Sequence, residues 1–182
     1  RQALDQGAAG AHVSHVDSAA EASAIVNACR YAPLGQREMS LGRAIAYDIS
    51  NLAKYVAQAN DSQLLVVMIE SVKGMENVEE IAAVPGIDVL HMGIADLTHA
   101  MGLKLGEHNP PVDRAVERVL RAAKKNKVTV GYPTEDPDEV AAWAAKGVRY
   151  FEGDTPDYLL RSVYSQRFKA LRELFQKQCH CS

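Results

Sequence analysis

The chain has 182 residues, of which 47% are hydrophobic and 24% charged, and its formal net charge is −3. This composition is typical of a globular domain with a sizeable core and argues against disorder. The lysines and arginines form no basic stripe, which argues against nucleic acid and anionic membrane surfaces as partners. Three cysteines make no disulfide framework and no apolar run reaches the roughly 20 residues of a bilayer span, so we expect a cytoplasmic protein.

The N-terminal part of the chain alternates between helical and strand-like segments. Residues 1–7 read as the last turns of a helix that ends at a glycine. Residues 10–16 are strand-like, and a capping box predicts a helix over 18–29. A long connection over 32–50 follows, until a helical period resumes at 51–56. Because the chain starts in the middle of such a unit and without methionine, we expect it to be incomplete at its N-terminus.

Two carboxylates, Glu70 and Asp96, follow the two most strongly apolar segments. Residues 64–69 predict a strand that runs into Glu70, and the strand predicted over 87–93 leads through a short loop to Asp96. The residues between them, 71–81, have helical spacing. Parallel strands that are joined by a helix bring their carboxyl ends together, where ligands collect in α/β folds. Two acids that converge at this edge indicate a divalent metal.

The remainder continues the alternation. The predicted elements are a loop over about 102–111, a helix over 112–125, a strand over 128–131, a helix from 136, a strand over 147–152 and a C-terminal helix from 155 to about 177. Five strands that alternate with helices, without a repeat or linker, predict a single α/β domain over residues 1–182. A (β/α)8 barrel usually takes about 250 residues, so this would be a barrel without its first three units. A complete five-stranded open sheet is the alternative that periodicity leaves open.

Several short motifs in this order resemble one enzyme family. They are Leu4-Asp5-Gln6-Gly7-Ala8-Ala9-Gly10, Arg30-Tyr31 with Pro33, Gly35 and Arg37, Ala59-Asn60, Ile69-Glu70-Ser71 and Gly93-Ile94-Ala95-Asp96-Leu97. The chain resembles, almost end to end, the HpcH/HpaI (4-hydroxy-2-oxo-heptanedioate) class II pyruvate aldolases, including their macrophomate-synthase-like fungal branch. The resemblance implies a TIM barrel of the phosphoenolpyruvate/pyruvate type, present here as about its last five βα units.

The resemblance also implies a site and a reaction. Glu70 and Asp96 would hold Mg²⁺ or Mn²⁺, and the ion would hold a 2-keto acid substrate through its carboxylate and keto oxygens. The backbone near Ala95, together with Gly93 and Met68, would contact that substrate. The expected activity is that of a lyase, an aldolase that works through a pyruvate enolate. The general base and the enolate-facing arginine of the family lie upstream of residue 1.

Three positions depart from the family pattern. Met68 stands where a glutamine that touches the keto acid is typical, and Ile94 and Ser14 each replace a proline. Two other functions therefore stay open: a non-catalytic scaffold or binding relative, and a citrate-lyase-β-like acyl-CoA lyase. Since open sheet edges associate readily, we expect a homo-oligomer or association with a segment that supplies the missing strands.

Other polar residues have simpler interpretations. Ser71 is expected to cap the helix that follows Glu70, although it is also placed to hydrogen-bond Glu70. The histidines at 12, 15, 91 and 99 lie on different elements without metal-ligand spacing, so packing or surface positions are expected for them. Arg37, in the long connection, is placed either to bind a substrate carboxylate or to form a salt bridge within the loop.

Overall fold

A computed structural model describes residues 1–107 and 109–179, without the side chains of 177–179. Its strands are β1 (Gly10–Val13), β2 (Leu64–Ile69), β3 (Val89–Met92), β4 (Thr129–Pro133) and β5 (Val148–Glu152). They form one parallel sheet in the order β1-β2-β3-β4-β5. A doubly wound sheet reverses its strand order at a switch point, whereas a barrel adds strands in sequence. The predicted α/β fold of barrel type is confirmed.

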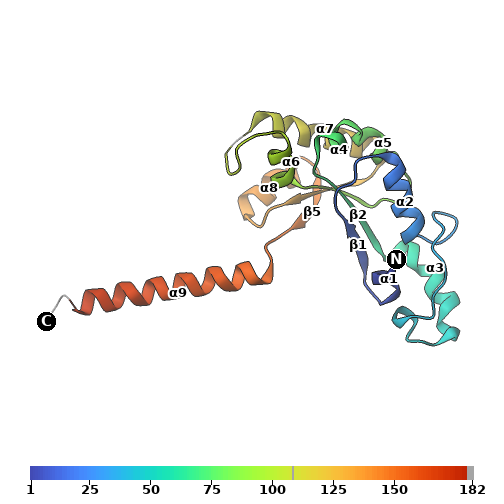
Figure 1. Ribbon diagram of the computed structural model, residues 1–182, viewed down its shortest axis with the longest axis horizontal. Coiled ribbons are helices and arrows are strands. Elements are labelled where there is room, and N and C mark those ends of the chain that lie inside the picture. The colour runs from blue at the N-terminus through green and yellow to red at the C-terminus, as the bar shows by residue number, and fades with distance from the viewer. Residues whose placement is uncertain (108, 180–182) are drawn as a thin grey trace.

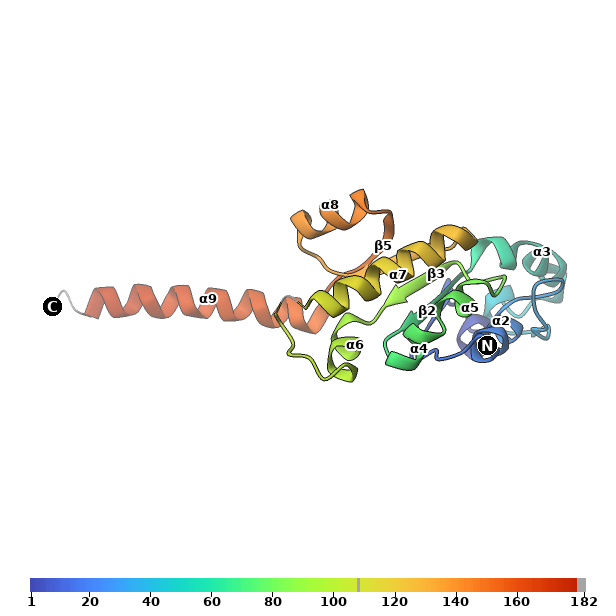
Figure 2. The ribbon, with the colours of Figure 1, turned by 90° about the horizontal axis from the view of Figure 1, so that it is seen from above.

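Helices follow the strands along one side of the sheet, as Figures 1 and 2 show for α2, α5 and α7. The α-helices are α1 (Gln2–Asp5), α2 (Ala19–Cys29), α3 (Leu52–Ser62), α4 (Val72–Glu76), α5 (Val78–Ala82), α6 (Ile94–Ala100), α7 (Pro110–Asn126), α8 (Pro137–Ala145) and α9 (Pro156–Cys179), and two short 3₁₀ turns are η1 (Arg43–Ile45) and η2 (Ile49–Asn51). Helix α2 packs on β2, α7 on β3 and β4, and α8 on β5. A sheet with helices on one face has the layering of a barrel wall.

The two faces of the sheet differ in chemistry because successive side chains of a strand alternate. The outer face carries the apolar residues that pack under the helices: Leu65, Val67, Ile69, Leu90, Met92 and Val130. The inner face carries His12, Met68, His91, Gly131, Tyr150 and Glu152, as the strand register places them. This inner face corresponds to the face that lines the interior of a barrel. The hydrophobic core therefore lies between the sheet and the helices, and the more polar side chains lie on the inner face.

Two buried arginines hold the opposite, amino-terminal end of the sheet. Arg30 donates to the backbone carbonyls of Asn60, Gln63 and Gly86 and to the carboxylate of Asp88. Arg37 pairs with Asp5 at 2.7 Å and also donates to Gln63 and Tyr55. The prediction that Arg37 binds substrate or pairs within its loop is wrong, because its partners come from α1 and α3 and from the residue that follows α3.

Two predicted elements also change. The helix expected over 71–81 is two short helices, α4 and α5, which meet at Asn77. The loop expected before Asp96 is the start of helix α6.

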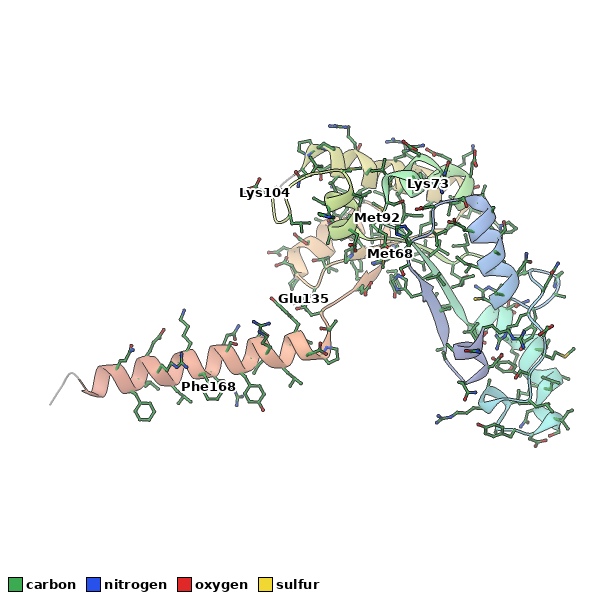
Figure 3. The ribbon with its side chains drawn as sticks, in the orientation of Figure 1. Met68, Lys73, Met92, Lys104, Glu135 and Phe168 are labelled. Atoms are coloured by element: carbon green, nitrogen blue, oxygen red, sulfur yellow. The ribbon has the colours of Figure 1, made fainter. Side chains whose placement is uncertain are left out.

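Helix α9 extends away from the sheet, with Phe168 and its other large apolar side chains exposed (Figures 1 and 3). Among the described residues, no helix is both long and apolar enough to span a bilayer.

Candidate functional site

Glu70 is the predicted metal ligand that the fold buries. It comes directly after β2, whose buried residues fix the end of the strand, and its side chain is only 11% exposed. Its Oε1 lies 3.6 Å from Nδ1 of His15, which follows β1. A largely buried carboxylate needs a partner, because desolvation of its charge is costly. Among the described residues, the group that faces the Glu70 carboxylate at this distance is the exposed imidazole of His15.

Gly93 allows Glu70 to lie close to the neighbouring strand. A Cβ atom at position 93 would lie 2.5 Å from the Glu70 Cβ and 3.1 Å from the Met68 Sδ. The Gly93 N–H donates to the carbonyl of Ile69 at 3.0 Å, which continues the parallel pairing past the end of β3. A side chain here would displace the Glu70 carboxylate. Gly93 and Met68 therefore both border Glu70, as a shared site requires.

Asp96 lies in the first turn of helix α6, which begins directly after Gly93. Leu97 donates its N–H to the Gly93 carbonyl at 2.9 Å, and the helix then runs to Ala100. Asp96 and its neighbour Ala95 are exposed. Sequence reasoning placed them in a loop because the apolar side of this short helix is too brief to show a period. The carboxylate thus sits at the carboxyl edge of the sheet, on a helical rather than an extended backbone.

Asp17 is a neighbour of the candidate site that the sequence did not single out. Its carboxylate accepts a hydrogen bond from the Ser71 hydroxyl and lies 3.7 Å from Nε2 of His15. The Ser71 Oγ in turn accepts from the Gly74 N–H at 2.8 Å, so the predicted capping of α4 by Ser71 is confirmed. His15 has a φ of 58° and stands between the carboxylates of Asp17 and Glu70. The strand-end argument that selected Glu70 applies equally to Asp17 and would have found it.

The spacing of the histidines in the sequence indicated that they lie apart, but two of them lie together in the fold. His12 on β1 and His91 on β3 meet on the inner face with ring centroids 5.0 Å apart, and Glu152 Oε2 lies 2.9 Å from His91 Nε2. Burial, reinforced by His12, lowers the pKa of His91 to about 4. His91 is therefore neutral at neutral pH, whereas His99 lies exposed in the last turn of α6.

A sequence model of the family described as HpcH/HpaI aldolase/citrate lyase matches residues 1–151. The chain is also 34% identical over 151 residues to the 2-keto-3-deoxy-L-rhamnonate aldolase of Klebsiella pneumoniae, an alignment that covers 81% of this chain and 57% of that protein. The chain belongs to the HpcH/HpaI aldolase/citrate lyase family. The family is one of divalent-metal-dependent aldolases and lyases, and the chain spans little more than half the length of the curated relatives that it matches.

Solved structures of the HpcH/HpaI family have the same fold. The HpcH/HpaI aldolase from Desulfitobacterium hafniense DCB-2 superposes with a TM-score of 0.83 at 28% identity, covering 93% of this chain and 66% of that one. Macrophomate synthase superposes with a TM-score of 0.79 at 32% identity, covering 96% of this chain and 62% of that one. The resemblance inferred from the motifs is thereby confirmed.

Proposed function

We propose that this chain carries the metal-binding and keto-acid-binding part of a class II aldolase, a carbon–carbon lyase that acts on 2-keto acids through a pyruvate enolate. The observation that carries the proposal is the largely buried Glu70 carboxylate at the carboxyl edge of the sheet. Glu70 packs against Gly93, and Gly93 directly precedes the helix whose first turn holds Asp96. In this proposal, residues 1–182 form a single α/β barrel domain in the cytoplasm. The whole protein catalyses the reaction of the family.

The donor set fits a hard divalent ion. Glu70 and Asp96 offer carboxylate oxygens, which Mg²⁺ and Mn²⁺ prefer, and two protein ligands leave positions for water and for a bidentate keto acid. When bound, the ion would supply Lewis-acid stabilisation of the enolate oxygen. Asp17 and His15 border Glu70, since His15 lies 3.7 Å from the Asp17 carboxylate and 3.6 Å from the Glu70 carboxylate.

The substrate contacts follow from the same geometry. Ala95 lies in the first turn of α6, where backbone N–H groups have no partner within the helix and can receive a substrate carboxylate. Gly93 has no side chain, so the Glu70 side chain and the Met68 thioether both lie close against its backbone. A thioether accepts hydrogen bonds only weakly and donates none. We therefore expect this site to bind small keto acids without the amide contact that is typical of the family.

Metal binding tests the core of the proposal. Calorimetric titration of the demetallated chain with Mn²⁺ should give one tight site that Glu70→Gln weakens sharply, because a neutral amide is a poorer ligand than a carboxylate. Glu80→Gln, which removes an exposed carboxylate from α5, is the matched control and should bind as the unmodified chain does. Equal Mn²⁺ affinity in Glu70→Gln and the unmodified chain would show that the site is assigned wrongly.

Keto-acid binding tests the substrate class. With Mn²⁺ present, Met68→Gln should tighten the binding of pyruvate or oxaloacetate by roughly fivefold, since one net hydrogen bond contributes about 1 kcal/mol. Met68→Leu, which has similar volume and no amide, is the control. If both variants bind keto acids equally or more weakly than the unmodified chain, the pocket is built for another ligand.

Turnover separates the aldolase from a binding relative. The resemblance places the base and the arginine of the family upstream of residue 1, so we expect the isolated chain to bind metal and keto acid without cleaving a 4-hydroxy-2-keto acid. A positioned base is commonly worth about 10²–10⁴-fold in rate. A retro-aldol assay that detects turnover by the isolated chain would refute this placement and would direct attention to His15, the imidazole beside Glu70.

A further inference from the structure

The inner face of the sheet carries a second group of metal-ligating side chains, apart from the Glu70 and Asp96 pair. His12 lies on β1, His91 on β3 and Glu152 at the end of β5, and one ligand atom from each lies within 4.8 Å of the others. Alternate strands supply one layer of a barrel interior, which explains why three residues so distant in sequence meet. Neither the keto-acid site nor the hydrophobic core uses this group.

The position of His91 depends on its neighbours. Its Nε2 lies 2.9 Å from Glu152 Oε2, and the rings of His12 and Tyr150 meet its ring edge to face at centroid distances of 5.0 and 5.6 Å. On the other side, a Cβ at Gly131 would lie 2.6 Å from its Nδ1. The absence of a side chain at Gly131 therefore leaves the space that the imidazole fills.

The two ring nitrogens of His91 have different surroundings. The side chain is only 1% exposed, and its Nδ1, on the Gly131 side, has no hydrogen-bond partner among the described residues. Its Nε2 lies 2.9 Å from Glu152 Oε2 and is the nitrogen that faces the group. The depressed pKa keeps the ring neutral, which is the form that binds metal. His12 and Glu152 lie on the same face as His91, and both are exposed in the described structure.

Two imidazole nitrogens and one carboxylate oxygen are a donor set of borderline softness, unlike the oxygen pair of Glu70 and Asp96. We propose that His12, His91 and Glu152 form a second metal site that prefers Zn²⁺ or Co²⁺ to Mg²⁺ and Mn²⁺. Ligands about 2.0–2.1 Å from a tetrahedral ion lie roughly 3.3 Å apart, so rotation of the two exposed side chains completes the site. A fourth position is left for water.

The second site lies deeper in the inner face than the keto-acid site. Met68 pairs in register with His91, and Glu70 lies two residues beyond Met68 toward the carboxyl edge. One layer of side chains thus separates the ligand sets along the strand direction. The two sites are expected to bind their metals independently, and the second does not rest on the function proposed for the first.

Zn²⁺ titration of the demetallated chain tests the proposal. Cys179→Ser and Cys181→Ser are included in every protein so that terminal thiols cannot bind the ion. His12→Gln and Glu152→Gln should each reduce Zn²⁺ affinity by more than the roughly 10- to 100-fold that is typical for loss of an outer-shell partner, because each removes a ligand. Both side chains are exposed, so neither substitution empties the core. His99→Gln, which removes an exposed histidine from α6, is the matched control and should leave the affinity unchanged.

The visible absorption of bound Co²⁺ reports the coordination directly. The control His99→Gln and Glu70→Gln should both give the intense spectrum of tetrahedral Co²⁺. His12→Gln and Glu152→Gln should lose that spectrum. All variants except Glu70→Gln should keep their Mn²⁺ affinity. The proposal is overturned if His12→Gln binds Zn²⁺ as tightly as the control. It is equally overturned if Glu70→Gln abolishes Zn²⁺ binding, since the ion would then occupy the carboxylate pair.

Discussion

The depressed pKa of His91 makes the stability of this fold depend on pH in a predictable direction. In the unfolded chain the imidazole takes up a proton near its ordinary pKa of 6.5, but in the folded chain burial and the nearby His12 lower that pKa to about 4. Protonation therefore favours the unfolded state throughout the interval between these values. The contribution of neutral His91 is fully present above pH 6.5 and is lost as the pH falls from 6.5 to about 4.

The size of the effect follows from the same two values. One unit of pKa difference corresponds to about 1.4 kcal/mol, so the full loss is about 3 kcal/mol, of which about 2 kcal/mol is reached at pH 5. The Glu152 carboxylate opposes the loss, because it lies 2.9 Å from His91 and attracts a protonated ring. Its side chain is 46% exposed, however, and water weakens such a pair.

Urea denaturation in the presence of a chelator measures this effect. The free energy of unfolding of the unmodified chain and of His91→Phe is compared at pH 7.5 and pH 5. The phenyl ring keeps edge-to-face packing with Tyr150 but cannot be protonated. Relative to the variant, the unmodified chain should lose about 2 kcal/mol between the two pH values.

Two results would contradict this reasoning. A difference between the two proteins that does not change with pH would show that His91 titrates normally in the fold. A difference that grows in favour of the unmodified chain at pH 5 would show that the pair with Glu152 dominates and raises the pKa. Glu152→Gln separates these cases, because it removes the attraction and leaves the burial of His91 in place.

Three further predictions follow from other parts of the structure. Arg37→Ala should lower the free energy of unfolding by about 3 kcal/mol in urea denaturation. It leaves the largely buried Asp5 carboxylate with the longer, 3.5 Å contact to the half-exposed Arg1, and a loss below about 1 kcal/mol would contradict the buried pair. Gly93→Ala should reduce Mn²⁺ affinity at least about tenfold in calorimetry, since the new Cβ displaces Glu70, and unchanged affinity would exclude Glu70 as a ligand. We expect the chain to associate as its concentration rises, and Phe168→Ser should shift it toward monomer in sedimentation velocity, because Phe168 is an exposed apolar residue of α9. If the substitution does not alter the association, the contact lies at the sheet edges instead.

Local patterns in the sequence determine the elements and one half of the site. The apolar run of β2, the capping serines and the proline after Asp136 specify strands and helix starts through interactions within a few residues, so they can be predicted before any fold is known. Glu70 is found in the same way, because it immediately follows a strand. The separation of α4 from α5 and the start of α6 escape prediction, since helices of five to seven residues show hardly two turns of any period.

What the tertiary structure decides is which of these residues meet. Arg37 reaches Asp5 across 32 residues, and His91 reaches Glu152 from a strand two positions away in the sheet. Neither pair has a spacing that a local rule recognises, because parallel pairing and the alternation of faces, and not distance along the chain, bring them together. The sequence by itself thus determined the sheet and the carboxylate that ends its second strand, whereas only the folded sheet placed two histidines and a glutamate on one inner face.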